Sequence, residues 1–249
     1  MAEMKEQRIA VLSDVHGNLE ALQSVLADVD AQGAAEILNL GDIVGYGPEP
    51  EACVTLLRER DVASVLGNHE LGLVEAQARN WFNPQARRAL DRTRELLSDD
   101  SLMYFRTLPR TMTAFGALFV HGCPPALVSK YLYELDADAL RETFALYPNQ
   151  LCFAGHTHEL ERISLFHGNG RIERKSLGKG LLTLAKDARH IVTAGSVGQP
   201  RDGNNKAKYL LWEPDHGRIE ARFVAYDIAR TAARIVEVGL PTVYADRLW

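Results

Sequence analysis

Cysteine is scarce in this chain of 249 residues. Only three are present, Cys53, Cys123 and Cys152, and no two of them form a CxxC pair. An odd number of cysteines without a CxxC pair argues against a disulfide framework. It also argues against a zinc ribbon or an iron–sulfur centre, because these sites need sets of cysteine thiolates as ligands. The sequence therefore predicts a protein of a reducing compartment, and we expect a cytoplasmic location.

A basic excess and a long apolar run are also missing. The formal net charge is −5 at pH 7, whereas dedicated nucleic-acid binders usually carry positive charge, so we expect no such binding. No stretch is long and apolar enough to span a membrane, and the polar start MAEMKEQR has no signal-peptide core. Apolar residues make up 46% of the chain, which is ordinary for a soluble globular protein.

Strand-like and helix-like segments alternate in the first third of the chain. Residues 8–12, 37–40 and 62–66 predict buried strands, and residues 19–29 and 50–60 predict helices. Asn18 is a suitable N-cap for the first helix, and Gly33 is a suitable stop. This order is typical of βαβ units with parallel strands.

The later segments follow a different pattern. Residues 70–110 predict a helical insertion, with a helix at about 84–97 that Asn83 caps and Pro84 begins. A hairpin is expected between residues 111 and 120. Further strands are expected at 151–154, 162–166, 171–176, 181–184, 190–194, 209–213 and 219–225, before a last helix at about 227–238. No linker rich in Pro, Gly or Ser interrupts the chain, so we expect one domain over residues 1–249.

Five short polar clusters each follow an apolar strand. They read SDVHGN at 13–18, GD at 41–42, GNHE at 67–70, HG at 121–122 and GHTH at 155–158. Because ligands in α/β sheets bind beyond the carboxyl ends of strands, we expect these clusters to converge on one site. Asp14 and His16 are two residues apart, as are His156 and His158, and in an extended strand end such positions point the same way.

The residue types in the clusters suit transition-metal ions. Carboxylate, amide oxygen and imidazole together favour Mn²⁺, Fe²⁺ or Fe³⁺, Zn²⁺ or Co²⁺. The set exceeds what one ion needs, so we interpret it as two divalent ions bridged by one carboxylate, for which Asp42 is the obvious candidate. Such a pair can orient both oxygens of an in-line phosphoryl displacement. Taken singly, each residue could have a structural role instead. Asn68 could cap a helix, and His121 could be a core histidine whose ring nitrogens are hydrogen-bonded within the protein.

In this order the clusters resemble the calcineurin-like metallophosphoesterase superfamily. The strings GDIVGYGP at 41–48 and GSVGQPRD at 195–202 resemble its branch of small bacterial and archaeal phosphodiesterases and diadenosine-tetraphosphatase-like proteins. The resemblance implies an α/β fold, a four-layer αββα sandwich with two mixed β-sheets. Carried over by position, it implies one metal ion on Asp14, His16, His158 and bridging Asp42, and another on Asn68, His121, His156 and Asp42.

The resemblance also implies a reaction. A metal-bridging hydroxide would hydrolyse a phosphodiester or a nucleotide phosphoanhydride, with Asp42 and His69 as the catalytic residues. The candidate substrate contacts are Asn18, Tyr46, His69 and Arg201, although Tyr46 could equally pack and GSVGQPRD could be a plain loop. Cys123 stands where Ser or Thr is commoner, and a thiol near metal ions would favour sensitivity to oxidation.

Three alternatives stay open at this point. A protein Ser/Thr phosphatase or phosphomonoesterase would share the metal site, and a non-catalytic metal-binding scaffold would share the fold. A metal-dependent nuclease would need a basic groove, which the negative net charge of the chain disfavours. The expected partner is a small phosphoester or nucleotide substrate, with neither a membrane nor a nucleic acid. The oligomeric state is open, and a homo-oligomer is one outcome that the sequence allows.

Overall fold

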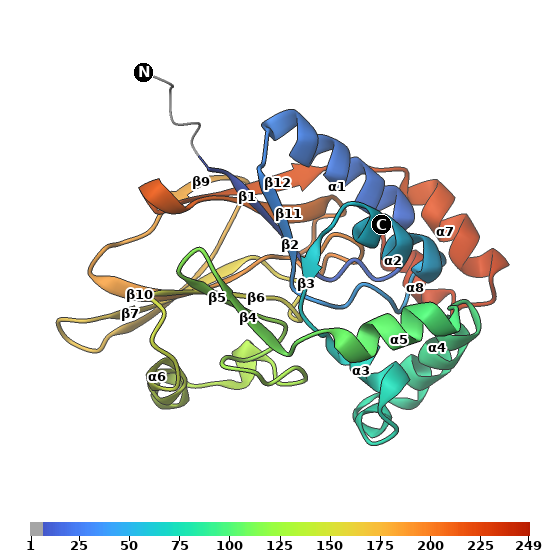
Figure 1. The fold of residues 1–249 in the computed structure, drawn as a ribbon, viewed down its shortest axis with the longest axis horizontal. Coiled ribbons are helices and arrows are strands. Elements are labelled where there is room, and N and C mark those ends of the chain that lie inside the picture. Colours follow the sequence, from blue (N-terminus) through green and yellow to red (C-terminus); the bar gives the residue numbers. More distant parts are fainter. Residues whose placement is uncertain (1–6) are drawn as a thin grey trace.

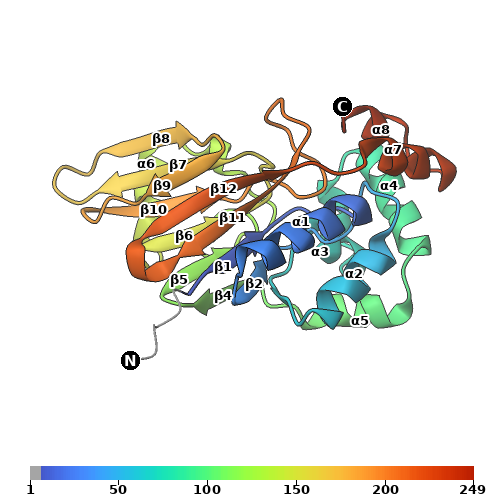
Figure 2. The same cartoon turned by 90° about the horizontal axis from the view of Figure 1, so that it is seen from above.

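The computed structural model describes residues 7–249 and arranges them as two facing β-sheets with helices on both outer sides (Figures 1 and 2). Sheet A has the order β3 (Ala63–Ser64), β2 (Glu36–Asn39), β1 (Ile9–Leu12), β11 (Ala207–Glu213), β12 (Arg218–Val224) and β9 (Gly180–Thr183). Sheet B has the order β4 (Thr111–Ala114), β5 (Ala117–Val120), β6 (Leu151–Ala154), β10 (Ala188–Thr193), β7 (Glu161–Phe166) and β8 (Ile172–Ser176). Both sheets are mixed, which confirms the expected fold class.

Each sheet contains a run of neighbouring parallel strands. β1, β2 and β3 are parallel in sheet A, and β5, β6 and β10 are parallel in sheet B. β1, β5 and β6 are buried at every position, as expected for strands that are covered on both faces. The polar clusters follow the ends of five of these strands, so the topology carries them all toward one edge of the sandwich.

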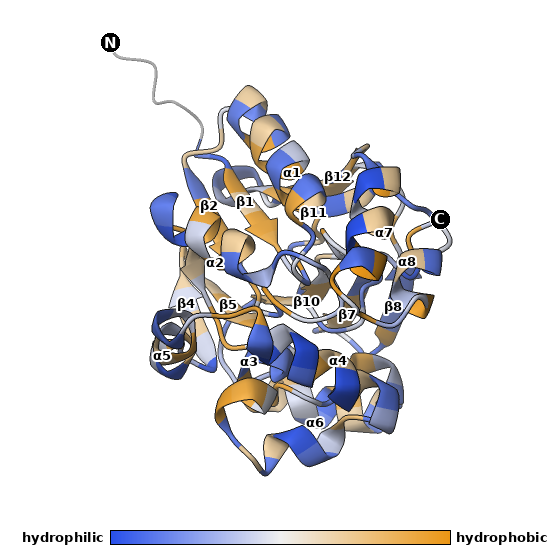
Figure 3. Cartoon of the chain, turned by 90° about the vertical axis from the view of Figure 1, so that its right-hand side faces the viewer, coloured by the Kyte–Doolittle hydropathy of each residue, from blue (hydrophilic) through white to orange (hydrophobic). Residues whose placement is uncertain are grey.

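Helices cover the outer faces of the two sheets. On sheet A lie α1 (Leu19–Gln32) and α2 (Pro50–Glu59), and α6 (Ala137–Ala145) lies on the opposite side of the molecule, against sheet B (Figure 1). Figure 3 shows the hydrophobic β1 enclosed behind helices whose outward turns are largely hydrophilic. Within residues 7–249, none of the helices combines the length and apolarity that crossing a lipid bilayer requires.

The alternation of side chains along β1 separates two of the apolar layers. Ala10 and Leu12 pack with residues of α1 and α2, whereas Ile9 and Val11 pack between the sheets, against residues such as Phe153. A third apolar cluster joins sheet B to α6. Since successive side chains of a strand point to opposite faces, one fully apolar strand can serve two layers of a four-layer αββα sandwich.

The helix caps expected from the sequence are present. The Asn18 side chain accepts a hydrogen bond from the backbone N–H of Ala21, and α1 stops at Gly33, which has a φ of +67°. Asn83 accepts from the backbone N–H of Ala86, and Pro84 is the first residue of its helix. These side chains satisfy backbone groups that helix ends leave without partners.

The segment between β3 and β4 holds more helix than the sequence predicted. It contains α3 (Asn68–Val74), α4 (Pro84–Glu95) and α5 (Asp99–Thr107), of which only α4 was expected. At the other end of the chain, α7 (Ile228–Glu237) was expected and α8 (Val243–Asp246) was not. Ala89 of α4 packs in one apolar cluster with residues of α7 and α8, so both segments gather at the same end of the sheets (Figure 2).

Candidate metal centre and substrate cavity

The seven side chains predicted as metal ligands lie together, buried, at the carboxyl ends of the parallel strands. Potential ligand atoms within 4.8 Å of one another form three overlapping groups. These groups are Asp14 with His16 and His158, His16 with Asp42 and His69, and Asp42 with His121 and His156. We call the seven predicted ligands the metal cluster: Asp14, His16, Asp42, Asn68, His121, His156 and His158.

One half of the metal cluster follows β1 and β6. His16 Nε2 lies 3.0 Å from His158 Nε2. Asp14 Oδ1 lies 3.6 Å from His16 Nε2 and 3.3 Å from His158 Nε2. Three ligand atoms from loops far apart in sequence therefore face one small volume.

The other half is joined to the first by Asp42. Asp42 Oδ2 lies 3.2 Å from His121 Nε2 and 3.7 Å from His16 Nε2, so it reaches a histidine of each half. His121 Nε2 also lies 3.0 Å from Asn68 Oδ1 and 3.2 Å from His156 Nδ1. Asp42 thus occupies the central position that a bridging carboxylate requires.

Backbone carbonyls determine which ring nitrogen of each histidine faces the cluster. Nδ1 of His16, His121 and His158 lies 3.0, 2.8 and 2.5 Å from the carbonyl oxygens of Val44, Leu40 and Gln199 respectively. A carbonyl only accepts, so Nδ1 carries the proton and Nε2 can present a lone pair. His156 is reversed, because its Nε2 lies 3.3 Å from the Ser129 carbonyl and its Nδ1 faces the cluster.

The donor set fits metal ions. Two ring nitrogens that both present lone pairs 3.0 Å apart, as in His16 and His158, repel each other unless a cation lies between them. Asp14 Oδ1 is buried and has no hydrogen-bond partner among the described residues, which is costly for a carboxylate oxygen. Oriented histidines and carboxylates of this kind are the usual surroundings of a protein-bound transition metal.

The charge states of the cluster support the same conclusion. Burial acts to raise the pKa of Asp42, but His121 and His69 outweigh it, so that carboxyl titrates well below its usual range. Burial lowers the pKa of His156 to about 4, which leaves the ring neutral at pH 7. His121 differs, because Asp42 overcomes the effect of burial and raises its pKa to about 9. A cation that binds there would displace a proton from His121.

The backbone of the cluster is strained, and this corrects one step of the sequence reasoning. Asp14, His16, Asp42, His156 and His158 all have positive φ, between +49° and +67°. Left-handed residues other than glycine are uncommon, and they cluster at functional sites. The paired ligands therefore converge through tight left-handed turns, and the extended strand end that we expected was wrong. Hydrogen bonds between the loops, such as His16 N–H to the Asp42 carbonyl at 2.9 Å, hold these turns.

His69 lies at the edge of the cluster. Its backbone N–H donates to Asp42 Oδ1 at 2.9 Å, and its ring stands edge-on to Tyr46 and Phe82, with centroids 4.5 and 5.0 Å apart. Its Nδ1 is buried without a hydrogen-bond partner among residues 7–249. A Cβ added to Gly45 would lie 2.1 Å from this nitrogen, so the ring fits only because residue 45 has no side chain. Burial lowers the pKa of His69 to about 3.

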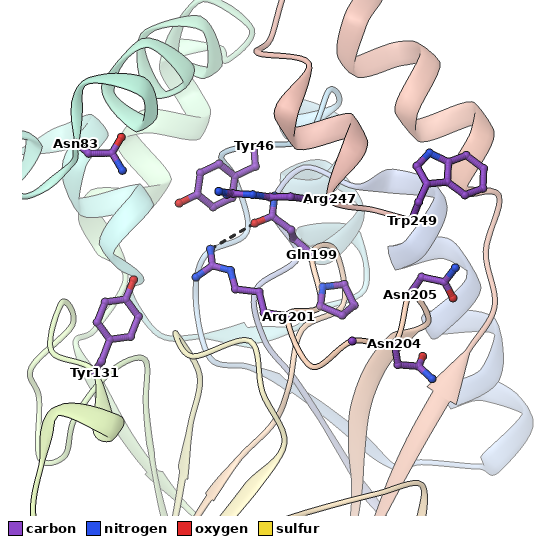
Figure 4. A pocket seen from close by; sticks show the side chains of 11 residues that line it. Tyr46, Asn83, Tyr131, Gln199, Arg201, Asn204, Asn205, Arg247 and Trp249 are labelled. Atoms are coloured by element: carbon purple, nitrogen blue, oxygen red, sulfur yellow. Dashed lines mark hydrogen bonds between the residues drawn. The ribbon is translucent and has the colours of Figure 1, made fainter.

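A cavity of about 610 Å³ opens beside the cluster (Figure 4). Its lining includes Tyr46, Asn83, Tyr131 and Arg201. A smaller recess of about 130 Å³ shares Tyr46, Asn83 and Tyr131 with it and also contains Asn68 and His156 of the metal cluster. The cavity therefore adjoins the cluster, and two of the predicted substrate contacts, Tyr46 and Arg201, lie on its wall.

Two other sequence expectations are placed differently by the structure. The amide of Asn18 is buried, caps α1 and donates to the Gly198 carbonyl at 2.9 Å. It lies at a small recess with His16 and Tyr46 and not on the wall of the main cavity, and its role as a substrate contact stays a prediction. Cys123 is also buried, and burial raises the pKa of its thiol. Since the thiolate is the form that oxidants attack, this opposes the oxidation sensitivity that we expected.

Sequence reasoning missed three aromatic or basic residues of the cavity, namely Tyr131, Arg247 and Trp249. The Tyr131 ring stacks on His156 with centroids 3.8 Å apart, so it covers one side of a candidate ligand. Arg247 and Trp249 follow α8, far in sequence from every cluster, and only the packing of α7 and α8 brings them there.

Comparisons with known proteins agree with this geometry. Residues 7–217 match the family model for the calcineurin-like phosphoesterase superfamily domain. The uncharacterized protein MJ0912 of Methanocaldococcus jannaschii is 34% identical over 251 residues, which cover 99% of each chain. The crystal structure of a metallophosphoesterase from Sphaerobacter thermophilus is similar with a TM-score of 0.84, at 36% identity over 98% of each chain. The hypothetical protein PH1004 from Pyrococcus horikoshii OT3 shares the fold, with a TM-score of 0.78 at 18% identity over 97% of each chain. The chain belongs to the calcineurin-like phosphoesterase superfamily, and it is a metal-dependent phosphoesterase.

Proposed function

We propose that the chain hydrolyses small phosphodiesters or nucleotide phosphoanhydrides with two divalent transition-metal ions. The observation that carries this proposal is the convergence of carboxylate oxygens and imidazole nitrogens on both sides of Asp42. Asp14, His16, His158 and Asp42 would hold one ion, and Asn68, His121, His156 and Asp42 would hold the other. The donor set suits Mn²⁺, Fe²⁺ or Fe³⁺, Zn²⁺ or Co²⁺.

The surrounding residues have separable roles in the reaction. When bound, the two ions would lower the pKa of a water molecule and offset charge on the phosphoryl oxygens. The water oxygen forms a bond to phosphorus as the bond to the leaving oxygen breaks, and the leaving oxygen takes up a proton. His69 is our candidate for the donor of that proton, because one nitrogen of its ring lies within 4.8 Å of ligand atoms of His16 and Asp42. Burial lowers the pKa of the free ring, and a nearby negative phosphoryl group would oppose this effect and favour the protonated form.

Arg201 and Tyr46 are our candidates for substrate contacts. Both line the cavity, and the Arg201 guanidinium has no carboxylate partner within the described part of the chain. A guanidinium in that position suits the bidentate hydrogen bonds that phosphoryl oxygens accept. A cavity of about 610 Å³ lies in the range of small-molecule sites, which favours a small phosphoester over a phosphoprotein.

Two properties of the whole chain belong to the same proposal. The cysteines are free and buried, as a reducing compartment allows, so we propose a cytoplasmic location. We also propose that the chain functions as a single domain, because α3, α4 and α5 pack against the same edge of the sheets that carries the cluster. A homo-oligomer stays a prediction.

Hydrolysis of a substrate panel in the presence of Mn²⁺ tests the proposal. The panel would compare a phosphomonoester, an activated phosphodiester, a cyclic nucleotide and a dinucleoside tetraphosphate. We expect the diester or the phosphoanhydride to have the highest kcat/KM.

Replacement of His69 by alanine should lower kcat by about 10²–10⁴-fold without loss of bound metal. Replacement of the exposed His167 by alanine is the matched control. A His69→Ala variant with wild-type kcat would contradict the assignment.

A further inference from the structure

The cavity has a second end that the metal cluster does not reach. Its wall there consists of the loop with Asn204 and Asn205 and the segment with Arg247 and Trp249 (Figure 4). Leu248 between the latter two is buried, and it packs in the apolar cluster of α4, α7 and α8. This anchor places the backbone of Arg247 and Trp249 at the cavity.

Two guanidinium groups face this cavity without a carboxylate to neutralise them. Neither Arg201 nor Arg247 has an acidic partner among residues 7–249, whereas Arg230 and Arg234 of nearby α7 are both paired with glutamates. In Figure 4 the Arg247 side chain extends across the ring of Tyr46, and the Arg201 guanidinium lies below that ring. In a chain with a net charge of −5, two like charges in one cavity indicate a site for an anion.

The far wall of the cavity suits a planar, polar ligand. Trp249 is 69% exposed and lines the cavity, so its indole is accessible to a ligand there. The amides of Asn204 and Asn205 lie on the same wall and offer both donors and acceptors. An indole face beside such amides can stack a flat ring system and hydrogen-bond its edge.

We propose that Arg247, Trp249 and the two asparagines form a leaving-group subsite. It would select phosphoesters whose leaving part carries a second phosphoryl group followed by a planar, hydrogen-bonding ring system. The arrangement of the lining residues supports this assignment. Asn83 and Tyr131, which the cavity shares with the recess of Asn68 and His156, lie on one side of the two guanidinium groups, and Asn204, Asn205 and Trp249 lie on the other side (Figure 4). The inference rests on the proposed function, because it takes the metal cluster as the place where the phosphorus atom is attacked.

The subsite is tested by measuring the binding of two analogues that cannot be cleaved between their phosphorus atoms. α,β-Methylene-ADP carries two phosphoryl groups and a ring system, and methylenebisphosphonate carries the two phosphoryl groups alone. Their dissociation constants would be measured by calorimetry on the Mn²⁺-loaded chain. The variants are Arg247→Met, which keeps the aliphatic stem, and Trp249→Ala. Arg106→Met, an exposed arginine of α5 that does not line the cavity, is the control.

The two variants should have different effects. Arg247→Met should weaken the binding of both analogues by about tenfold or more, since each loses a charge-assisted contact. Trp249→Ala should weaken α,β-methylene-ADP by about fivefold or more and leave methylenebisphosphonate within about twofold of wild type. An Arg247→Met variant that binds both as wild type does, or a Trp249→Ala variant that weakens both equally, would overturn the subsite.

Failure of the subsite and failure of the proposed function can be told apart. If the subsite alone is wrong, the wild-type chain still binds Mn²⁺ and hydrolyses bis(p-nitrophenyl) phosphate, while the variants bind the analogues normally. If the proposed function is wrong, the wild-type chain shows neither metal-dependent hydrolysis nor bound metal. The Arg106→Met control should match wild type in metal content, hydrolysis and analogue binding.

Discussion

Replacing Gly45 with alanine would show whether the position of His69 sets the rate. Gly45 has a φ of +93°, and a Cβ there would lie 2.1 Å from His69 Nδ1, deep inside van der Waals contact. The imidazole would have to move by more than about 1 Å, and a displacement of that size can cost about 10²-fold in rate. The metal cluster would be unaffected, because Gly45 contributes no ligand to it. We therefore expect kcat to fall by about 10²-fold while bound Mn²⁺ stays at the wild-type level.

Gly33→Ala is the matched control for this variant. Gly33 also has a positive φ, +67°, but nothing lies within 4 Å of a Cβ added there. Both variants should lose about 1–2 kcal/mol of unfolding free energy from the left-handed conformation. Gly45→Ala should lose about 1–3 kcal/mol more from the clash with His69, and only this variant should lose rate. Thermal unfolding, metal analysis and steady-state kinetics would be measured on both. Equal kcat values in the two variants would show that the position of His69 does not set the rate. Loss of metal from Gly45→Ala alone would show that the variant acts through the metal cluster instead.

Three further predictions follow from particular contacts. Asp42→Asn should lose most of the bound metal and the activity together, because a neutral amide does not replace a bridging carboxylate. Metal analysis that finds both ions retained would contradict the bridging role of Asp42. Lys208→Met should lower the unfolding free energy by about 3 kcal/mol and also lower kcat/KM, since the buried ammonium holds the loop that carries Arg201. Urea denaturation and steady-state kinetics would measure the two effects. If neither the unfolding free energy nor kcat/KM changes, Lys208 does not hold that loop. For Asp28, burial acts to raise its pKa, but hydrogen bonds from Arg222 outweigh it and lower the pKa below the ordinary 3.8. Because its pKa is lower in the folded state, the stabilisation is present at neutral pH and is lost as the pH falls through the native value. Asp28→Asn should therefore lower the unfolding free energy by about 1 kcal/mol at pH 7 and by less below pH 3.8; a difference that does not depend on pH would contradict this.

The residues of the metal cluster could be predicted from the sequence because their signal is local and repeated. Each cluster follows a short apolar run, and an apolar run that ends in a polar cluster marks the carboxyl edge of a buried strand. Asn18 and Asn83 carry a similarly local signal, since an N-cap acts on the next turn of its own helix. These features needed no knowledge of distant contacts.

The rest depends on tertiary contacts that the sequence does not display. The left-handed backbone at His16 and His158 is held by hydrogen bonds between loops, so an extended strand end was the wrong expectation. α6 was missed although Asp136 caps it, because its apolar positions are few and its helix is short. Arg247 reaches the cavity only through the packing of α8 on α4, which no periodicity within α8 indicates.

Metal analysis of the chain reconstituted with Mn²⁺ is the most direct test of a site that holds two ions. We expect two ions per chain and a Mn²⁺-dependent hydrolysis of bis(p-nitrophenyl) phosphate that a chelator abolishes. The same preparation of Asp42→Asn should retain less than one ion per chain. A wild-type stoichiometry of one ion or none, or hydrolysis that continues in the chelator, would contradict a site that holds two ions.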